Sequence, residues 1–372
     1  MRIILIIPEL SSGGAERVLV LLAKGFLQRD HSVSVLTMSN DDADFYSLPT
    51  GVKRIALNLR YKSATPLHAL WNTVVRLVCL RKAIQSTQPD VVISFMPQMN
   101  ILTALALFRT NYAVIATQHS SAKMFPCGQP WELLRHATYP QLQKVVSVSQ
   151  DVDDEFSWLP KGKRAVISNP FLPIKRTHVQ IDYPNKVDPD KKWIVAMGRL
   201  INAKGFDLLL AAFEKIADRY PDWDLLILGE GELKLELENL RDRLKLSESV
   251  VFTGAISNPF PLLQRAKLFV LASRTEGFPM ALGEALACGL PVISTNCSSG
   301  IREVMRDGID GILVPNQDVG ALAAAMDRLM SDEAERNRLA TRAPEVVERF
   351  SLDKVLDRWE TLIVEVLQNT HN

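Results

Sequence analysis

Two glutamates, Glu276 and Glu284, flank a predicted loop-to-helix junction in the stretch EGFPMALGEA. Pro279 suits the first turn of a helix, where its missing N–H costs nothing, and Gly289 supplies a stop, so we predict a helix over about residues 280–288. The free N–H groups and the positive dipole end of this helix face the loop. The junction is therefore suited to hold an anion or a polyol oxygen.

Carboxylates at these two positions suit a sugar ligand. A carboxylate accepts hydrogen bonds from two adjacent hydroxyls at once. One glutamate on the loop and one on the helix can therefore bind two parts of one ligand. In the alternative interpretation, Glu276 caps the helix and Glu284 lies on a solvated face. The loop also offers backbone groups to the same ligand, at Gly277, Phe278 and Pro279.

Two cations follow a second predicted element. The strand-like run 193–197 leads directly into Gly198 and Arg199, and Lys204 comes shortly after. Cations at the carboxyl end of a parallel strand neutralise charge on a departing diphosphate, which is where such a transition state gains negative charge. The alternative is that both are ordinary surface cations.

These motifs, in this order, resemble those of the family-four retaining glycosyltransferases of the GT-B fold. The hallmark of that family is two glutamates separated by seven residues in an EGFPxxxxEA context, which the segment from Glu276 to Ala285 matches. The resemblance implies transfer of a glycosyl group from a nucleotide sugar with retention, by front-face attack, with the departing phosphate helping to deprotonate the acceptor. It further implies that Arg199 and Lys204 hold the donor diphosphate at a catalytic site shared with Glu276. Beside the nucleotide-sugar donor, neither a cofactor nor a metal is expected.

Two glycine turns extend the predicted donor site. Gly13 and Gly14 open a helix after the first strand, where backbone N–H groups can approach a phosphate or a sugar, although a plain tight turn is the alternative. The turn at Gly229 and Gly231 lacks the third glycine of the dinucleotide fingerprint, so it is weak evidence for a nicotinamide enzyme. In the family that the chain resembles, this turn lines the nucleotide pocket, and the loop near Ile256 contacts the base.

His119 lies just past a predicted strand end. Several members of the family that the chain resembles have a histidine in this loop, directed at the acceptor or the reacting sugar. Such a histidine can accept a hydrogen bond from the acceptor hydroxyl or support the anomeric centre through its backbone carbonyl. A purely structural histidine is the alternative.

The amino-terminal half of the chain is basic, although the whole chain has a net charge of only +1. Residues 1–170 hold 18 Lys and Arg against 12 Asp and Glu, and Asp90 is the single acid in residues 45–131. Residues 66–85 read as an amphipathic helix with basic edges, which suits an anionic membrane surface or a pyrophosphate-bearing lipid. An ordinary surface helix that packs Leu and Val inward is an equal alternative. The cations assigned to the acceptor or the membrane are Arg60, Lys62, Arg76, Arg81 and Lys82.

The composition indicates a globular enzyme of the cytoplasm. Hydrophobic residues make up 47% of the 372 residues, but no apolar run reaches the length of a membrane span and the first run is too short for a signal peptide. The four cysteines lack the spacing of a zinc site or a disulfide framework, and the DxD triplets at 151–153 and 222–224 do not indicate a metal site. We expect no nucleic-acid partner and a peripheral location on the inner face of the cytoplasmic membrane.

Short apolar runs alternate with helical segments throughout the chain, which predicts an α/β fold with two doubly wound domains. The resemblance makes this the GT-B fold, two Rossmann-like domains facing across a cleft. Residues 1–170 with a returning helix at 352–372 would bind the acceptor, and residues 171–351 would bind the nucleotide sugar. The predicted strands are 3–7, 32–37, 91–94, 113–117, 145–148, 193–197, 224–228, 250–253, 268–271, 291–294 and 311–314.

Three functions compete at this point. The favoured one adds a hexose or N-acetylhexosamine, from a UDP-sugar donor, to a glycan linked to polyprenyl diphosphate. The second is a transferase acting on a small soluble acceptor. The third is a non-catalytic protein that binds sugar nucleotides. Membrane sedimentation separates the first two, and turnover separates both from the third.

Overall fold

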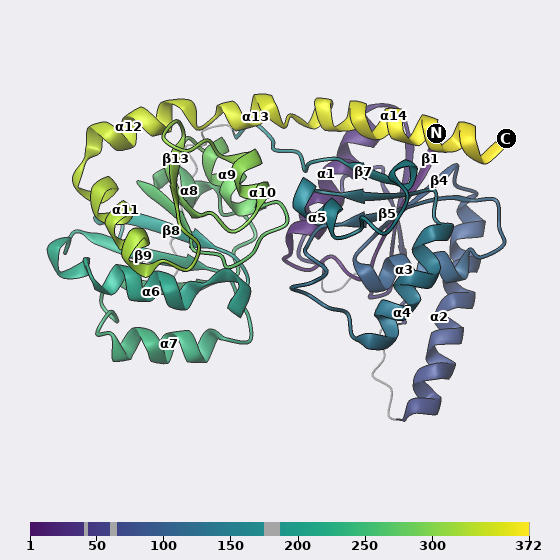
Figure 1. Ribbon diagram of the computed structural model, residues 1–372, viewed down its shortest axis with the longest axis horizontal. Coiled ribbons are helices and arrows are strands. Elements are labelled where there is room, and N and C mark those ends of the chain that lie inside the picture. The colour runs from purple at the N-terminus through teal and green to yellow at the C-terminus, as the bar shows by residue number, and fades with distance from the viewer. Residues whose placement is uncertain (41–43, 60–64, 175–186, 372) are drawn as a thin grey trace. The chain divides into compact units, whose positions relative to one another are not determined.

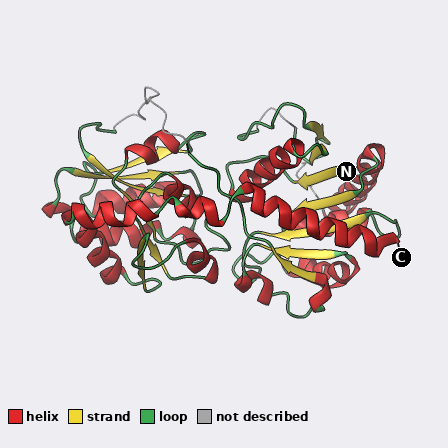
Figure 2. Cartoon of the chain, turned by 90° about the horizontal axis from the view of Figure 1, so that it is seen from above, coloured by secondary structure: helices red, strands yellow, loops and turns green. Residues whose placement is uncertain are grey.

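The chain forms two compact units, each built on its own sheet (Figure 1). The structure is a computed structural model that describes residues 1–40, 44–59, 65–174 and 187–371. The first unit combines Met1–Pro170 with Leu352–Asn372, and the second is Phe171–Ser351. In each unit the strands lie between helices (Figure 2). The prediction of two doubly wound α/β domains is confirmed.

The sheet of the first unit is parallel throughout and has the order β3-β2-β1-β4-β5-β6-β7. Its central strands are apolar because helices cover both faces of the sheet. Two short edge strands, β3 and β7, were not predicted; both are only half-buried at their middle residues and carry basic residues that obscure the apolar pattern. The strands are β1 (Arg2–Ile7), β2 (Ser32–Thr37), β3 (Lys53–Ala56), β4 (Val91–Phe95), β5 (Ala113–Gln118), β6 (Lys144–Ser147) and β7 (Arg164–Val166).

The last helix of the chain belongs to the first unit. Trp359 and Ile363 lie on the buried stripe of this helix, which packs on α1. Arg29, the C-cap of α1, adds ion pairs of 2.7 Å to both Asp357 and Glu360. The helices of this unit are α1 (Gly14–Gln28), α2 (Pro66–Thr87), α3 (Pro97–Ala106), α4 (Gln129–Thr138), α5 (Gln150–Asp154) and α14 (Leu352–His371).

The sheet of the second unit is also parallel and has the order β10-β9-β8-β11-β12-β13. The strand order reverses between β8 and β11, and open α/β sheets bind ligands at the carboxyl ends of the strands at such a point. All six strands were predicted from their buried apolar runs. They are β8 (Lys192–Met197), β9 (Trp223–Leu228), β10 (Val250–Gly254), β11 (Leu268–Leu271), β12 (Val292–Thr295) and β13 (Gly311–Val314).

Helices and three aromatic rings complete the second unit. Phe278 stacks on Phe171 with 5.7 Å between ring centroids and meets Phe350 edge-on at 5.4 Å. The backbone N–H of Phe171 donates to the carbonyl of Phe350 at 2.9 Å, so the first and last segments of the unit lie side by side. The helices are α6 (Phe206–Glu214), α7 (Lys234–Arg243), α8 (Phe260–Arg265), α9 (Met280–Ala287), α10 (Ser299–Val304), α11 (Val319–Ser331), α12 (Glu333–Arg342) and α13 (Glu345–Arg349), with short 3₁₀ helices that include η3 (Asn202–Lys204) and η4 (Ala217–Arg219).

Candidate active site

Lys204 and Glu276 meet at the point where the strand order of the second sheet reverses. Lys204 ends η3, which follows β8, and Glu276 lies in the loop between β11 and α9. Lys204 Nζ is 2.6 Å from Glu276 Oε1, and the exposed fractions of the two side chains are 23% and 8%. The fold thus brings a predicted diphosphate-binding cation into contact with a predicted sugar-binding carboxylate.

Glu276 Oε1 also accepts a hydrogen bond of 2.6 Å from Ser273 Oγ. The carbonyl of Ser273 in turn accepts one of 2.5 Å from Thr295 Oγ1. Both donors use the same carboxylate oxygen, and Oε2 makes no hydrogen bond with any residue that the structure describes. Glu276 is therefore held in place while one of its oxygens is left to accept a ligand hydroxyl.

Cys297 lies close to this pair. Burial, together with the nearby Glu276 carboxylate, raises the pKa of its thiol to about 12. The thiol is therefore protonated throughout the physiological range. It contributes a neutral wall to the site rather than a thiolate nucleophile.

Arg199 is exposed at the end of β8 and forms no ion pair within the described part of the chain. The aliphatic stem of Lys204 instead packs against Gly198, where a Cβ atom would stand 3.4 Å from Cδ of the lysine. Arg199 and Lys204 therefore flank one short loop, but only Lys204 reaches Glu276. Arg199 remains available to a ligand, and its role stays a prediction.

The glycines of the 229–231 turn are required by close backbone packing. A Cβ at Gly229, which has φ of 148°, would lie 2.0 Å from the carbonyl oxygen of Gly198. A Cβ at Gly231 would lie 2.4 Å from the carbonyl oxygen of Leu200. The turn thus supports the loop that carries Arg199. Contact of the turn, or of the half-buried Ile256, with a nucleotide stays a prediction.

The helix α9 begins at Met280 as predicted, but Pro279 is its N-cap rather than part of its first turn, and it ends at Ala287, one residue before the predicted end. A Cβ at Gly300 would lie only 2.1 Å from the carbonyl oxygen of Gly277, so the start of α10 packs directly on this loop. Phe278 is buried in the aromatic contacts described above. Glu284 is half-buried on α9, so it is not the fully solvated residue of the alternative interpretation.

In the first unit, the predicted glycine turn encloses a carboxylate that the sequence analysis did not assign. Gly13 is the N-cap of α1 and Gly14 its first residue. Glu16 is buried and folds back over the turn, because a Cβ at Gly13 would stand 2.3 Å from Glu16 Oε2. Ser11 Oγ donates to Glu16 Oε1 at 2.8 Å. The sequence shows how far Glu16 lies from the two glycines, but it does not show that the Glu16 side chain points back over the turn.

A second residue that sequence reasoning missed directly follows the strand next to β1. Met96 follows β4, the neighbour of β1 at the reversal of the first sheet, and has φ of 76°. Left-handed φ is uncommon for a residue with a side chain, and such strain concentrates at functional sites. The Met-Pro sequence after a buried strand was the only signal.

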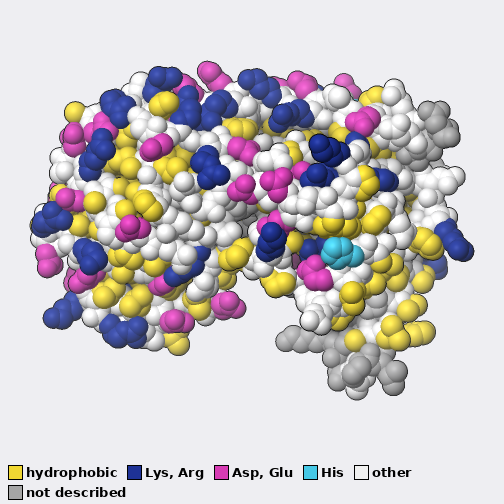
Figure 3. Space-filling model, viewed as in Figure 1, with side chains coloured by type: hydrophobic (Ala, Val, Ile, Leu, Met, Phe, Trp, Pro, Cys, Tyr) yellow, Lys and Arg dark blue, Asp and Glu magenta, His cyan; other side chains and the backbone are white. Residues whose placement is uncertain are grey.

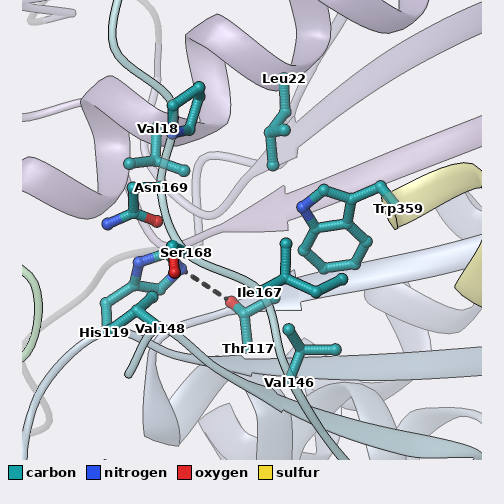
Figure 4. A pocket seen from close by; sticks show the side chains of 11 residues that line it. Val18, Leu22, Thr117, His119, Val146, Val148, Ile167, Ser168, Asn169 and Trp359 are labelled. Atoms are coloured by element: carbon teal, nitrogen blue, oxygen red, sulfur yellow. Dashed lines mark hydrogen bonds between the residues drawn. The ribbon is translucent and has the colours of Figure 1, made fainter. Parts of the chain in front are cut away.

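His119 follows β5 and lines a small pocket together with Trp359 of α14 (Figure 4). Its ring stacks on Phe95 with 5.3 Å between centroids, and its Nε2 lies 3.1 Å from Thr117 Oγ1. Nδ1 is buried and has no partner in the described part of the chain. Burial lowers the pKa of His119 to about 4, so the imidazole is neutral at pH 7. The remaining lining residues are Val18, Leu22, Val146, Val148, Ile167, Ser168, Asn169 and Pro170.

This low pKa predicts a pH-dependent stability. The unfolded chain has the ordinary pKa of 6.5 at His119, so between pH 6.5 and about 4 it binds a proton that the folded state excludes. The contribution of neutral His119 to the free energy of unfolding is therefore fully present above pH 6.5, and it is lost as the pH falls toward 4. We expect the free energy of unfolding to drop by about 2 kcal/mol more in the wild type than in His119→Asn between pH 7.5 and pH 5, as measured by urea denaturation. Equal losses in both proteins would contradict a neutral His119 imidazole in the folded state.

The basic helix of the first unit is α2, and its apolar residues do not all point inward. Leu70, Trp71, Val74 and Val78 are exposed by 65%, 66%, 45% and 47%, whereas Leu80 and Ile84 are buried. The alternative of a helix packing its Leu and Val side chains inward is therefore wrong for the first part of α2. None of the described helices is long and apolar enough to pass through a bilayer.

The cations assigned to this region divide into three groups. Arg81 and Lys82 are exposed on α2. Arg76 donates from Nε to the carbonyl oxygen of Leu59 at 3.0 Å, so its guanidinium is partly used inside the unit. Arg60 and Lys62 lie outside the described residues.

Three of the four aspartates of the two DxD triplets are used in ion pairs. Asp224 is buried and lies 2.9 Å from Lys191 Nζ, and Asp222 pairs with Lys192 at the same distance. Asp153 pairs with Arg164 at 2.6 Å. Within the described ranges, no group of three His, Cys, Asp or Glu side chains is arranged to hold a metal ion.

Comparison with known proteins agrees with this architecture. Residues 12–171 match the model of Glycosyltransferase Family 4, and residues 180–346 match that of Glycosyl transferases group 1. An uncharacterized glycosyltransferase of Haemophilus influenzae is 24% identical over 353 residues, which cover 95% of this chain and 97% of the relative. The GalNAc-α-(1→4)-GalNAc-α-(1→3)-diNAcBac-PP-undecaprenol α-1,4-N-acetyl-D-galactosaminyltransferase of Campylobacter jejuni is 29% identical over 98% of this chain and 99% of its own length.

Solved structures extend the comparison to the fold. The sucrose-phosphate synthase of Thermosynechococcus elongatus superposes with a TM-score of 0.81 at 20% identity, covering 99% of both chains. Anabaena HepE in complex with UDP superposes with a TM-score of 0.76 at 17% identity, covering 98% of this chain and all of that one. The two family models and this shared architecture show that the chain belongs to the family-four glycosyltransferases, with a group-1 carboxyl-terminal part and the GT-B fold.

Proposed function

We propose that this glycosyltransferase moves a hexose or N-acetylhexosamine from a UDP-sugar to a glycan linked to polyprenyl diphosphate, with retention of configuration and without a metal. The observation that carries the proposal is the contact between Lys204 and Glu276 at the reversal point of the second sheet. A nucleotide sugar presents a diphosphate next to sugar hydroxyls. The Lys204 ammonium suits the negatively charged diphosphate, and the Glu276 carboxylate suits the neighbouring sugar hydroxyls, which donate hydrogen bonds.

The chemistry follows from these two side chains and their neighbours. As the bond between the anomeric carbon and the phosphate oxygen breaks, negative charge grows on the diphosphate, and Lys204 and Arg199 stabilise it. Glu276 accepts a hydrogen bond from a sugar hydroxyl through its open Oε2 and so fixes the sugar relative to the diphosphate. The acceptor oxygen bonds to the anomeric carbon on the same face, and its proton passes to the departing phosphate. His119, neutral at pH 7, can accept a hydrogen bond from the acceptor hydroxyl.

The acceptor class is supported by the relatives. Two Campylobacter jejuni proteins similar to this chain are named as transferring N-acetylgalactosamine to undecaprenol-linked diphospho-glycans, one of them along nearly its whole length. The amylovoran biosynthesis glycosyltransferase of Erwinia amylovora is 24% identical over 97% of this chain. We propose the same class of lipid-linked acceptor here, in cell-surface glycan assembly.

The first test is a nucleotide panel. We expect UDP and UDP-sugars to raise the melting temperature more than the ADP, GDP or dTDP counterparts, because a ligand bound only by the folded state stabilises it by mass action. The shift should persist in EDTA, and slow donor hydrolysis should accompany it. A GDP-selective response would change the proposed donor from a UDP-sugar to a GDP-sugar and would leave the proposed transfer reaction unchanged. A response without any turnover would favour the non-catalytic protein that binds sugar nucleotides. No response to any nucleotide would contradict the proposal.

We also propose that the exposed stripe of α2 rests on an anionic membrane surface, where a polyprenyl-linked acceptor resides. Leu70, Trp71, Val74 and Val78 recur along one side of the helix, and Arg81 and Lys82 follow them. Figure 3 shows hydrophobic side chains gathered around this end of the first unit. An apolar stripe bordered by cations is typical of helices that lie in the interface of a bilayer, and each cation near an anionic surface adds about 1 kcal/mol.

Vesicle sedimentation tests this surface. We expect binding to vesicles that contain anionic lipid, with a loss of at least about tenfold both for Trp71→Glu and for Arg81→Glu with Lys82→Glu. The matched control changes two exposed cations of the second unit, Lys215→Glu with Arg243→Glu, and should bind like the wild type. If the control variant weakens vesicle binding equally, the effect is due to the net charge of the protein and not to the surface of α2. Wild-type protein that stays in the supernatant would favour the small soluble acceptor.

A further inference from the structure

Arg274, two residues before Glu276, connects the loop of Glu276 to the segment that carries Lys204. Its Nη1 donates to the carbonyl oxygen of Asn202 and to Asp207 Oδ1, both at 2.8 Å, and its Nη2 donates to Asp207 Oδ2 at 2.6 Å. Its backbone N–H donates to the carbonyl oxygen of Ala203 at 2.8 Å. One residue thus binds the chain on both sides of Lys204.

The contact with Asp207 is a two-pronged arginine–carboxylate pair, the strongest common form of side-chain hydrogen bonding. Partial burial acts to raise the pKa of Asp207, but the hydrogen bonds from Arg274 hold it below its ordinary value. The Arg274 side chain is only 17% exposed. The pair is therefore ionised. Its arginine is mostly covered although the Asp207 side chain is 44% exposed, and its two-pronged geometry distinguishes it from the surface ion pairs that contribute little.

The two segments also touch through their backbones. Gly205 has φ of 63°, and a Cβ there would lie 2.0 Å from the carbonyl oxygen of Ala272. Asn316 Nδ2 donates to the carbonyl oxygen of Arg274 at 3.1 Å, so the loop is held from a third direction. The Lys204–Glu276 contact is thus one result of a close fit between two segments, and Arg274 provides most of the bonds between them.

We propose that Arg274 is a positioning residue for donor binding and transfer, acting through Lys204 and Glu276 without touching the substrate. This inference rests on the proposed function for its catalytic consequence. Both terminal nitrogens of Arg274 are already engaged within the protein, which leaves the guanidinium poorly placed to bind a diphosphate itself. A shift of about 1 Å between a bound diphosphate and the sugar costs about 10²-fold in rate.

Kinetics of Arg274 variants provide the first test. We expect kcat/KM for the UDP-sugar to fall by about 10²-fold in Arg274→Ala and about tenfold in Arg274→Lys, because an ammonium cannot form the planar fork. The control is Arg219→Ala, which removes another arginine–aspartate pair of the second unit, with Asp327 on α11. Its activity should stay within about twofold of the wild type. Wild-type activity in Arg274→Ala would overturn the proposal.

A double-mutant cycle separates positioning from general destabilisation. If Arg274 acts through Lys204, Arg274→Ala should cost less than about threefold when Lys204 is already alanine, because effects of residues acting as a unit are not additive. The full loss on that background would show that Arg274 supports the fold without acting through the pair, and the proposal would fail.

Hydrogen exchange tests the connection without any substrate. In Arg274→Ala, the amides of residues 203–206 and 273–277 should exchange at least about tenfold faster than in the wild type, and in Arg219→Ala they should not. If the exchange rates of these amides are unchanged in Arg274→Ala, the proposed connection through Arg274 (the Arg274 clamp) is overturned, whatever the activity of the variant. Faster exchange in a protein whose wild type turns over no nucleotide sugar would sustain the clamp and reject the proposed function, so the two failures are distinguishable.

Discussion

Glu276→Gln is expected to lower kcat/KM for the donor by at least about 10²-fold while leaving the fold intact. Glutamine has nearly the same shape, but its neutral amide loses the charge-assisted bond to Lys204 and accepts more weakly from sugar hydroxyls. Glu276→Ala should lose as much or more. Initial rates measured with the true donor and acceptor, beside melting temperatures, test this expectation.

The matched control for this prediction is Glu335→Gln. Glu335 is also a well-covered carboxylate of the second unit, 13% exposed and paired with Arg328 and Arg338, but it lies on α12 away from the reversal point. It should lose some stability and no more than about twofold in rate. A Glu276 variant as active as this control would reject Glu276 as a catalytic residue.

Lys204→Met is expected to have a comparable effect, with a different signature. Methionine keeps most of the stem that packs on Gly198, but it leaves the Glu276 carboxylate facing the donor diphosphate without a cation between them. We therefore expect a loss of about 10²- to 10³-fold in kcat/KM and the disappearance of the UDP-induced rise in melting temperature.

Lys192→Met serves as the control for the lysine. Lys192 forms an ion pair with Asp222 at the start of β8 and is 46% exposed. Its replacement should preserve both activity and the response to UDP. If Lys204→Met still responds to UDP as strongly as this control, the diphosphate is held elsewhere and the site assignment is wrong. Combining Lys204→Met with Glu276→Gln should cost less than the product of the two single effects, because each variant alone leaves a charge without its partner.

The strands were predictable wherever burial is complete. Runs such as Ile3 to Ile7 lie between covered faces of a parallel sheet, so the sequence shows them as uninterrupted apolar residues. The edge strands β3 and β7 were not predicted because one side of an edge strand needs no apolar residue, and Lys53, Arg54 and Arg164 occupy these strands. Pairing with a neighbour, which local sequence does not record, makes them strands.

The candidate site was predictable in its residues and less so in its contacts. Lys204 and Glu276 follow strands that the reversal rule places side by side, and the direct ion pair between them agrees with that rule. Ser273, Arg274 and Asp207 were not singled out, since their hydrogen bonds join segments far apart in the sequence. The depressed pKa of His119 likewise depends on burial by neighbours such as Phe95, which only the folded chain supplies.

The hydrogen bond between Phe171 and Phe350 has an evolutionary consequence. Because the first and last segments of the second unit are joined at one place, this unit has the form of a cassette inserted into the chain after Pro170 and before Leu352. Domains whose ends lie together can be exchanged between proteins with little disturbance to their host. Recombination at these two positions would transplant the Lys204–Glu276 pair, the Arg274 clamp and the aromatic ring contacts as one inheritable block. The first unit would keep its own sheet and helices in such an exchange.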